Sequence, residues 1–287
     1  MRSPNLVVYC AIDSLISPSA QPVPGFDDFL AALTEATIPC VWVTKRNRHQ
    51  LDTALRMLGQ GVPFMAESGS GVYLPEGYFN LRPERMVRFA RFTCIPVASP
   101  LPAAAHALES LAEETNIEVV PLRSLSPREL SQNTGLRQRD AELLRQRDFE
   151  EYFFFAGASD SEIKTFAEEA KRRDLQLRPR ENLWSIVPGS NTTTCVHELN
   201  KLYDRAMKGT AYRVAIALAP GESSKNKGDK VGDDDAAELF PACNRSILLT
   251  RPSGVSDAPL PRHNLAVPFG SPDTWEVVLE AVQAKRT

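Results

Sequence analysis

Three features are missing from this sequence of 287 residues: a long apolar run, an excess of one charge and a cysteine motif. No stretch approaches the roughly 18 consecutive apolar residues of a membrane-spanning helix. The 33 Lys and Arg residues nearly balance the 36 Asp and Glu residues, so the net charge of −3 provides no basic excess for nucleic-acid binding. These absences predict a protein whose partners include neither a membrane nor a nucleic acid.

The cysteines are few and scattered, and no two of them stand at the C-x-x-C spacing of a zinc site. Their odd number and wide separation also give no disulfide framework. We therefore expect small buried thiols in the reducing cytoplasm. The five cysteines are Cys10, Cys40, Cys94, Cys195 and Cys243.

The first apolar run, residues 6–12, is stopped by Asp13, and no A-x-A-like cleavage site follows it. A continuous apolar run of this length is typical of a strand that is covered on both faces in a parallel sheet. We therefore predict a buried first strand rather than a signal peptide. At roughly 100–200 residues per domain, the length of the chain indicates about two domains.

Strands and helices alternate over the first seventy residues, which is typical of a doubly wound α/β sheet. The same alternation returns after a middle region that contains its own helices and strands. We therefore predict a Rossmann-like parallel sheet core, residues 1–81 and 188–287, with an inserted α/β cap domain, residues 82–187. The predicted core strands are 6–12, 39–43, 64–66, 213–219 and 246–250, and the core helices are 27–36, 49–58, 194–208, 234–240 and 272–284.

One segment, residues 221–235, is polar, rich in glycine and dense in both charges. A surface loop is the plainer interpretation of such a composition. Its place is nevertheless informative, because it follows a predicted apolar strand at the edge where open α/β sheets hold their ligands.

Four segments resemble one enzyme family. They are residues 63–79 (PFMAESGSGVYLPEGYF), 134–136 (TGL), 141–153 (AELLRQRDFEEYF) and 270–278 (GSPDTWEVV). They are similar to motifs of the mannosyl-3-phosphoglycerate phosphatases, a branch of the haloacid dehalogenase-like (HAD) hydrolases with a large α/β cap. The resemblance runs over nearly the whole chain. It implies a HAD-like core, a cap, an aspartyl-phosphate mechanism and a Mg²⁺ ion.

The first two catalytic motifs of the family are only partly kept. The segment that matches DxDGT is residues 11–15 (AIDSL), so Ala11 stands at the position of the nucleophilic aspartate. Asp13 matches the second aspartate of this motif. The resemblance implies that Asp13 is the general acid and that its backbone carbonyl binds the metal. Thr44 matches the phosphate-binding Ser or Thr after the second strand, although a strand-end threonine more often caps a helix. Lys45, Arg46 and Arg48 add positive charge nearby.

The remaining two catalytic motifs are also altered. Thr192 stands where the family has a lysine that neutralises the phosphoryl group, and threonine supplies no charge. In the acidic metal-binding motif, Glu222 replaces the first aspartate, and Asp235 or Asp234 matches the last one after a gap. An ungapped match puts Asn226 there instead. The resemblance therefore implies a metal site built from Asp13, Glu222 and Asp235, with weak affinity for Mg²⁺.

The cap segments contain the residues that the resemblance assigns to the substrate, a small phosphorylated sugar or glycerate. They are Arg147, Glu151 and Thr134. An ordinary surface ion pair between Arg147 and Glu151 is the plainer alternative.

Three hypotheses follow. The first is a catalytically impaired member that keeps a sugar-phosphate pocket, because losing a nucleophile typically costs on the order of 10⁴–10⁶ in rate. The second is an active Mg²⁺-dependent phosphohydrolase that acts on mannosyl-3-phosphoglycerate or a related glycosyl phosphoglycerate, with a carboxylate from the acidic loop in the catalytic role. The third is a structural α/β protein without a ligand. Nothing in the sequence identifies a protein partner.

Overall fold

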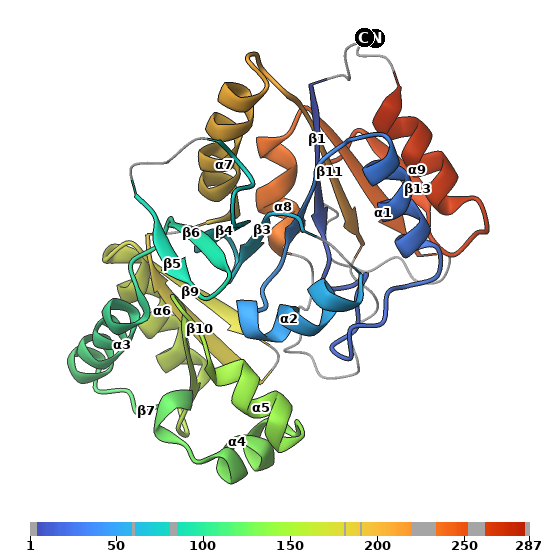
Figure 1. Ribbon diagram of the computed structural model, residues 1–287. Helices are drawn as coiled ribbons and strands as arrows, with labels where there is room; N and C mark the ends of the chain where they lie inside the picture. The colour runs from blue at the N-terminus through green and yellow to red at the C-terminus, as the bar shows by residue number, and fades with distance from the viewer. Residues whose placement is uncertain are drawn as a thin grey trace.

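The computed structural model describes residues 5–58, 61–80, 85–180, 182–189, 191–219, 234–251 and 262–284, with the backbone alone for residues 234 and 235. Figure 1 shows two parts, a larger part built on a sheet and a smaller part beside it. In the described ranges, no helix is both long and apolar enough to cross a bilayer.

The larger part is built on a nine-stranded sheet. Its strands, in spatial order, are β13 (Leu265–Pro268), β12 (Arg245–Thr250), β11 (Tyr212–Leu218), β1 (Leu6–Ala11), β2 (Cys40–Val43), β3 (Phe64–Ala66), β4 (Gly71–Pro75), β6 (Phe92–Pro96) and β5 (Val87–Phe89). The strands from β13 to β3 pair in parallel, and the last three pair antiparallel. The predicted parallel core is therefore confirmed, with an antiparallel extension at one side.

Helices cover both faces of this sheet, because every described residue of the central strand β1 is apolar and buried. Val8 and Cys10 face one apolar cluster, and Val7, Tyr9 and Ala11 face the other. The first face packs against α1 (Phe26–Glu35), α2 (Arg48–Met57) and α9 (Thr274–Gln283), and the second against α7 (Thr192–Ala206), α8 (Asp234–Leu239) and the 3₁₀ turn η2 (Phe240–Ala242). This is the doubly wound arrangement that the sequence predicts.

The smaller part has its own antiparallel sheet, in the order β7 (Val119–Pro121), β8 (Glu151–Phe155), β10 (Leu183–Pro188) and β9 (Leu175–Arg180). One face packs against α3 (Leu101–Thr115) and α6 (Asp160–Arg172). The 3₁₀ turn η1 (Leu122–Ser124), α4 (Pro127–Thr134) and α5 (Gln138–Arg145) form a second apolar cluster with it. Gly135, with φ of 71°, ends α4 and separates it from α5.

We keep the division into core and cap as a proposal, because sheet pairing alone does not define independently folding units. The pairing favours one change in the boundaries. β5 and β6 belong to the large sheet, so the first boundary lies near residue 97 rather than at 81. The second lies close to the proposed residue 188, where β10 ends.

Candidate functional site at the carboxyl edge of the core sheet

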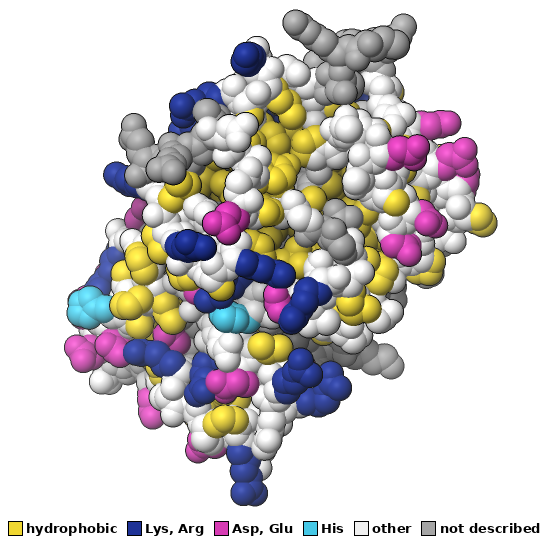
Figure 2. Space-filling view, viewed as in Figure 1, with side chains coloured by type: hydrophobic (Ala, Val, Ile, Leu, Met, Phe, Trp, Pro, Cys, Tyr) yellow, Lys and Arg dark blue, Asp and Glu magenta, His cyan; other side chains and the backbone are white. Residues whose placement is uncertain are grey.

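The predicted catalytic positions gather where β1, β2 and α7 meet below the cap. Positively charged side chains are concentrated across the middle of the face shown in Figure 2, where α2 approaches α5 of the cap. Asn47, which caps α2, donates a hydrogen bond of 2.7 Å from its side chain to the carbonyl of Leu143 at the end of α5. The site therefore lies beneath a cap that is docked directly on the core.

At the end of β1, the structure places a methyl group at the position to which the motif resemblance assigns a nucleophile. Ala11 is 2% exposed and pairs with Val43 of β2. Its side chain belongs to the apolar cluster under α7 and α8. A methyl group in these surroundings neither attacks phosphorus nor binds a cation.

Asp13 and Thr44 are brought together, as the matching of their motifs predicts. The Thr44 hydroxyl donates to Oδ1 of Asp13, and the backbone N–H of Lys45 donates to Oδ2 at 2.7 Å. Thr44 is fully buried, and its own N–H donates to the carbonyl of Met65 at 3.0 Å. Both oxygens of the Asp13 carboxylate are therefore bound by groups of the protein itself.

Arg46 adds a third contact to this carboxylate and holds the loop that follows β1. Its Nε lies 3.3 Å from Oδ1 of Asp13, and Nη2 donates to the Asp13 carbonyl at 3.2 Å. The guanidinium also donates to the carbonyls of Ile16 and, at 3.3 Å, Ser17. The sequence indicates positive charge here, but it does not reveal that one arginine is bound by four oxygens of residues 13–17.

At the start of α7, a carboxylate has taken the position next to Thr192. The N–H of Thr192 donates to Oε2 of Glu238 at 2.7 Å, and the hydroxyl of Thr193 donates to the Glu238 carbonyl at 2.6 Å. A carboxylate is well placed at a helix N-terminus because the backbone N–H groups and the helix dipole favour negative charge there. The Thr192 hydroxyl is buried and has no hydrogen-bond partner among the described residues.

The predicted acidic motif falls mostly outside the described residues. Glu222 and the rest of the segment up to residue 233 belong to that part of the chain. Asp235 lies in the first turn of α8, and only its backbone is described. Their role as metal ligands stays a prediction.

The described residues at this edge do not fit a magnesium ion. Ala11 provides no carboxylate, and the Asp13 carbonyl, which the resemblance assigns to the metal, accepts a hydrogen bond from Arg46. In the part of the chain that is described, no three His, Cys, Asp or Glu side chains come close enough together to hold a metal. Mg²⁺ needs nearly octahedral oxygen coordination, and these residues do not supply it.

Arg147 lies in the interface between cap and core. Its side chain is 2% exposed and donates to Glu150 at 2.7 Å and to the Lys45 carbonyl at 2.8 Å. Its guanidinium also stacks on the ring of Tyr152, 4.0 Å from the centroid. Burial alone would lower the pKa of Arg147, but Tyr152, Glu67 and Glu150 raise it above its usual value. Arg147 therefore carries a positive charge inside the interface, and the alternative of a surface pair with Glu151 is wrong.

Glu150 is the carboxylate around which this interface is organised. It is fully buried and lies 3.6 Å from Arg178 and 3.5 Å from Arg180, in addition to its bond with Arg147. Burial raises the pKa of Glu150, but the three arginines together bring it below its usual value. Arg180 donates to the Ser68 hydroxyl of the core at 2.7 Å, and Arg178 lies 3.5 Å from Glu238. The sequence does not single out Arg178, Arg180 or Glu150.

Glu67 provides the core side of the same interface. Its carboxylate accepts backbone N–H groups of residues 148, 149 and 150 at 2.8, 3.0 and 2.8 Å, and Nε of Arg147 lies 3.6 Å away. Burial raises the pKa of Glu67 above its usual value; Arg147 and the N–H groups of residues 148 and 150 oppose the rise, and Glu150 adds to it. Glu67 and Ser68 both adopt left-handed φ angles, of 53° and 52°. Backbone strain of this kind is commonly concentrated at functional sites.

The other two predicted cap residues lie elsewhere. Side chains alternate along a strand, so Glu151 shares the face of β8 with Phe153, which packs against α3 and α6. It pairs with Arg123 at 3.1 Å. Thr134 ends α4, at the far end of the cap in Figure 1, and its hydroxyl donates to the Leu130 carbonyl at 2.6 Å. A role for either residue in substrate binding stays a prediction.

The face of the cap sheet that belongs to this network is polar. Ser185 pairs directly with Arg178 on one side and with Tyr152 on the other, so the three side chains share one face. The Ser185 hydroxyl is buried and, among the described residues, has no hydrogen-bond partner. The same is true of Nη1 of Arg147. Buried polar groups are nearly always hydrogen-bonded in proteins, so these unpaired groups at one interface are exceptions.

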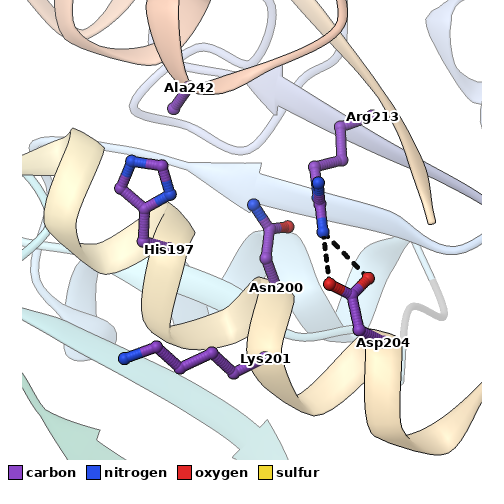
Figure 3. A pocket seen from close by; sticks show the side chains of 6 residues that line it. All are labelled: His197, Asn200, Lys201, Asp204, Arg213 and Ala242. Atoms are coloured by element: carbon purple, nitrogen blue, oxygen red, sulfur yellow. Dashed lines mark hydrogen bonds and ion pairs between the residues drawn. The ribbon is translucent and has the colours of Figure 1, made fainter. Parts of the chain in front are cut away.

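A separate hollow of about 300 Å³ is lined by residues of α7, β11 and η2 (Figure 3). Its lining includes Asp204 and Arg213, which are joined by contacts of 2.8 and 2.7 Å, and Asn200, which accepts a hydrogen bond from Tyr9 at 2.5 Å. The remaining lining residues are His197, Lys201 and Ala242. None of the predicted site residues lines this hollow.

Comparison with solved structures shows the fold. A haloacid dehalogenase-like hydrolase from B. subtilis matches with a TM-score of 0.56 at 12% identity, over 98% of this chain and 99% of that one. A phosphatase of the haloalkanoate (HAD) superfamily from Bacteroides thetaiotaomicron matches with a TM-score of 0.60 at 14% identity, over 99% and 97% of the two chains. The chain has a HAD-like fold. The predicted fold class is therefore confirmed.

Two curated proteins are similar in sequence, and both are named glucosyl-3-phosphoglycerate/mannosyl-3-phosphoglycerate phosphatase. The protein from Methanococcoides burtonii is 22% identical over 228 residues, which cover 79% of this chain and 78% of the relative. The protein from Persephonella marina is 23% identical over 235 residues, which cover 81% and 83%. No family model matches the chain. The resemblance to this branch of the HAD hydrolases is confirmed, at low identity.

Proposed function

We propose that this protein binds a small phosphorylated sugar or glycerate between core and cap and does not hydrolyse it through an aspartyl-phosphate. The proposal rests on one observation, the end of β1. The buried methyl group of Ala11 stands at the nucleophile position, while the carboxylate of Asp13 is bound by Thr44, Lys45 and Arg46. Covalent phosphoryl transfer requires a nucleophile at this place.

The interface between cap and core supports the binding part of the proposal. Three buried arginines, Arg147, Arg178 and Arg180, meet there. Arginine is well suited to phosphate and carboxylate groups because its planar guanidinium forms paired hydrogen bonds with their oxygens. The unpaired hydroxyls of Ser185 and Thr192 belong to the same interface, one on each side. A ligand with several oxygens fits this chemistry.

The alternative is an active Mg²⁺-dependent phosphohydrolase on mannosyl-3-phosphoglycerate or a related glycosyl phosphoglycerate. The names of the two curated relatives favour it. In that case a carboxylate of the acidic segment, with Glu222 and Asp235 as candidates, would have to supply the missing chemistry. For either function we propose a cytoplasmic location, in keeping with the absence of cysteine motifs.

Phosphate release from mannosyl-3-phosphoglycerate and glucosyl-3-phosphoglycerate, with saturating Mg²⁺, separates the two functions. We expect no enzyme-like turnover by the wild type. The Ala11→Asp variant, measured beside it, restores a carboxylate at the end of β1. Any activity that this variant gains would show that the rest of the site can still support phosphate release. Enzyme-like turnover by the wild type would overturn the proposal in favour of the alternative.

Titration calorimetry with the same two compounds tests binding. We expect wild-type binding that falls by on the order of tenfold or more in Arg178→Met, because a charged hydrogen-bond donor is lost. Arg123→Met is the matched control, since Arg123 is a half-exposed cap arginine that pairs with Glu151 away from the interface. A wild type that neither binds nor turns over these compounds would favour the structural protein without such a ligand.

A further inference from the structure

The loop after β1 surrounds a cation that belongs to the chain itself. Four oxygens of residues 13–17 contact the guanidinium of Arg46: the carboxylate and carbonyl of Asp13 and the carbonyls of Ile16 and Ser17. The backbone N–H of Arg46 also donates to the Thr44 hydroxyl at 3.1 Å, which fixes the start of the side chain. The Arg46 side chain is only 13% exposed.

We propose that Arg46 is the resident cation of this site and excludes a divalent metal ion from it. The oxygens it contacts, one carboxylate and three carbonyls, are the kinds of oxygen that Mg²⁺ and Ca²⁺ prefer. A metal ion on the Asp13 carbonyl would lie next to a positive guanidinium already bound to the same oxygen, and like charges at that separation repel strongly. Ligand binding by this chain therefore needs no divalent ion. The last statement rests on the proposed function, whereas the exclusion of metal does not.

The geometry distinguishes this arrangement from an ordinary surface ion pair. Isolated surface pairs contribute little because water solvates both partners. The guanidinium of Arg46 instead donates to three carbonyls of one loop, and its partner Asp13 is 19% exposed. Two residues further along, Arg48 pairs with Asp148 at 2.7 Å and lies over the ring of Phe89. The contacts of the Arg48 side chain are thus with Asp148 and Phe89 rather than with the loop, so Arg48 offers a control of similar burial.

The test measures thermal stability with and without Mg²⁺ or Mn²⁺, in the absence of any sugar phosphate. We expect that the cation does not raise the Tm of the wild type by binding at Asp13. Any rise that the wild type shows should therefore persist in Asp13→Asn. Arg46→Ala should unfold at a lower temperature than the wild type, because the four oxygens lose their partner. It should then gain stability when the cation is added, by on the order of 5 °C at about 100 times Kd.

Three further variants make the result specific. Arg46→Ala combined with Asp13→Asn should lose the cation response, which separates binding at the loop from binding at the acidic segment. Arg48→Ala should be destabilised without gaining a response. If Arg46→Ala does not fold, Arg46→Gln keeps an amide donor to the carbonyls, removes the charge, and should show the same gain. Mn²⁺ binding, followed by electron paramagnetic resonance, provides a second readout.

Two results would overturn the inference. One is a saturable cation response of the wild type that Asp13→Asn removes, since the metal would then share the site with Arg46. The other is the absence of any response in both Arg46 variants, which would make Arg46 only a support for the loop. Neither result depends on phosphate release or sugar-phosphate binding, so the inference and the proposed function can fail separately.

Discussion

Among single residues, Glu151 has a distinctive protonation behaviour. Burial raises the pKa of its carboxyl to about 7; Arg123 opposes the rise and Glu109 adds to it. The folded protein therefore keeps a proton that the unfolded chain releases between about pH 4.5 and pH 7. Because the native state binds more protons in this window, the free energy of unfolding falls as the pH rises through it.

Glu151→Gln should remove this pH dependence. We expect the variant and the wild type to have similar stability near pH 4.5. The variant should be more stable by about 1–3 kcal/mol at pH 8, where the wild type holds a buried carboxylate. Urea unfolding at a series of pH values measures the difference. A constant difference between the two proteins over this range would show that Glu151 titrates normally.

Glu67 differs from Glu151 in that its buried carboxyl group holds a set of hydrogen bonds that the fold requires. Glu67→Ala leaves Arg147 without one of its anions and three backbone N–H groups without their acceptor. We expect a loss of about 3–5 kcal/mol in the free energy of unfolding. Glu76→Ala, which breaks an exposed pair with Arg88, should change stability little. Similar effects of the two variants in urea unfolding would contradict the role given to Glu67.

The sequence predicts some of these residues but not their partners. Asp13 and Thr44 meet because both follow parallel strands at one edge of a sheet, which is a consequence of strand order alone. Arg147 pairs with Glu150 rather than Glu151, because the alternation of β8 turns Glu151 toward α3 and α6. Which of the two neighbouring glutamates faces Arg147 depends on how the cap packs. The spacing of charges along the chain carries no information about this packing.

Between elements, one close approach lies where the loop after β3 meets the N-terminus of α7. Gly69 has φ of 81°, and a Cβ built on it would lie 2.6 Å from the Cα of Thr192 and 2.7 Å from its N. Both opposing atoms are backbone, so a flexible side chain cannot move aside to make room. The glycine therefore allows α7 to begin next to the strained turn that carries Glu67.

Gly69→Ala should be destabilised by more than Gly77→Ala. Both glycines have positive φ, but nothing lies within 4 Å of a Cβ on Gly77. Gly77→Ala should therefore cost only the backbone strain, about 1–2 kcal/mol. Gly69→Ala should cost roughly 1–3 kcal/mol more, because α7 must shift. Equal losses in thermal unfolding would mean that the contact relaxes easily.

Most core elements are predicted within two residues of their ends, because their apolar periodicity is set by burial between two helical layers. The strands that sequence reasoning missed lack this pattern. β9 contains Arg178, Pro179 and Arg180, which resemble a polar loop. Its arginines are buried because Glu150 and the core lie opposite, and its proline is tolerated at the edge of the cap sheet. β4 and β13 are also short, with five and four residues.

For the whole molecule, the charged network determines how cap and core behave together. The cap contributes Arg147, Glu150, Arg178 and Arg180, and the core contributes Glu67, Ser68 and Glu238. A buried carboxylate among three guanidiniums stabilises them only while it is charged. If Glu150 becomes neutral, the three cations repel one another across the interface.

Glu150→Gln should therefore uncouple the two parts. We expect the wild type to unfold in a single calorimetric transition, whereas the variant should unfold in two, with faster proteolysis at the linkers near residues 97–100 and 188–191. Glu142→Gln is the matched control, because Glu142 pairs with Arg145 on a half-exposed surface of the same segment. A variant that keeps one transition at the wild-type temperature would show that apolar packing, rather than this network, holds the cap on the core.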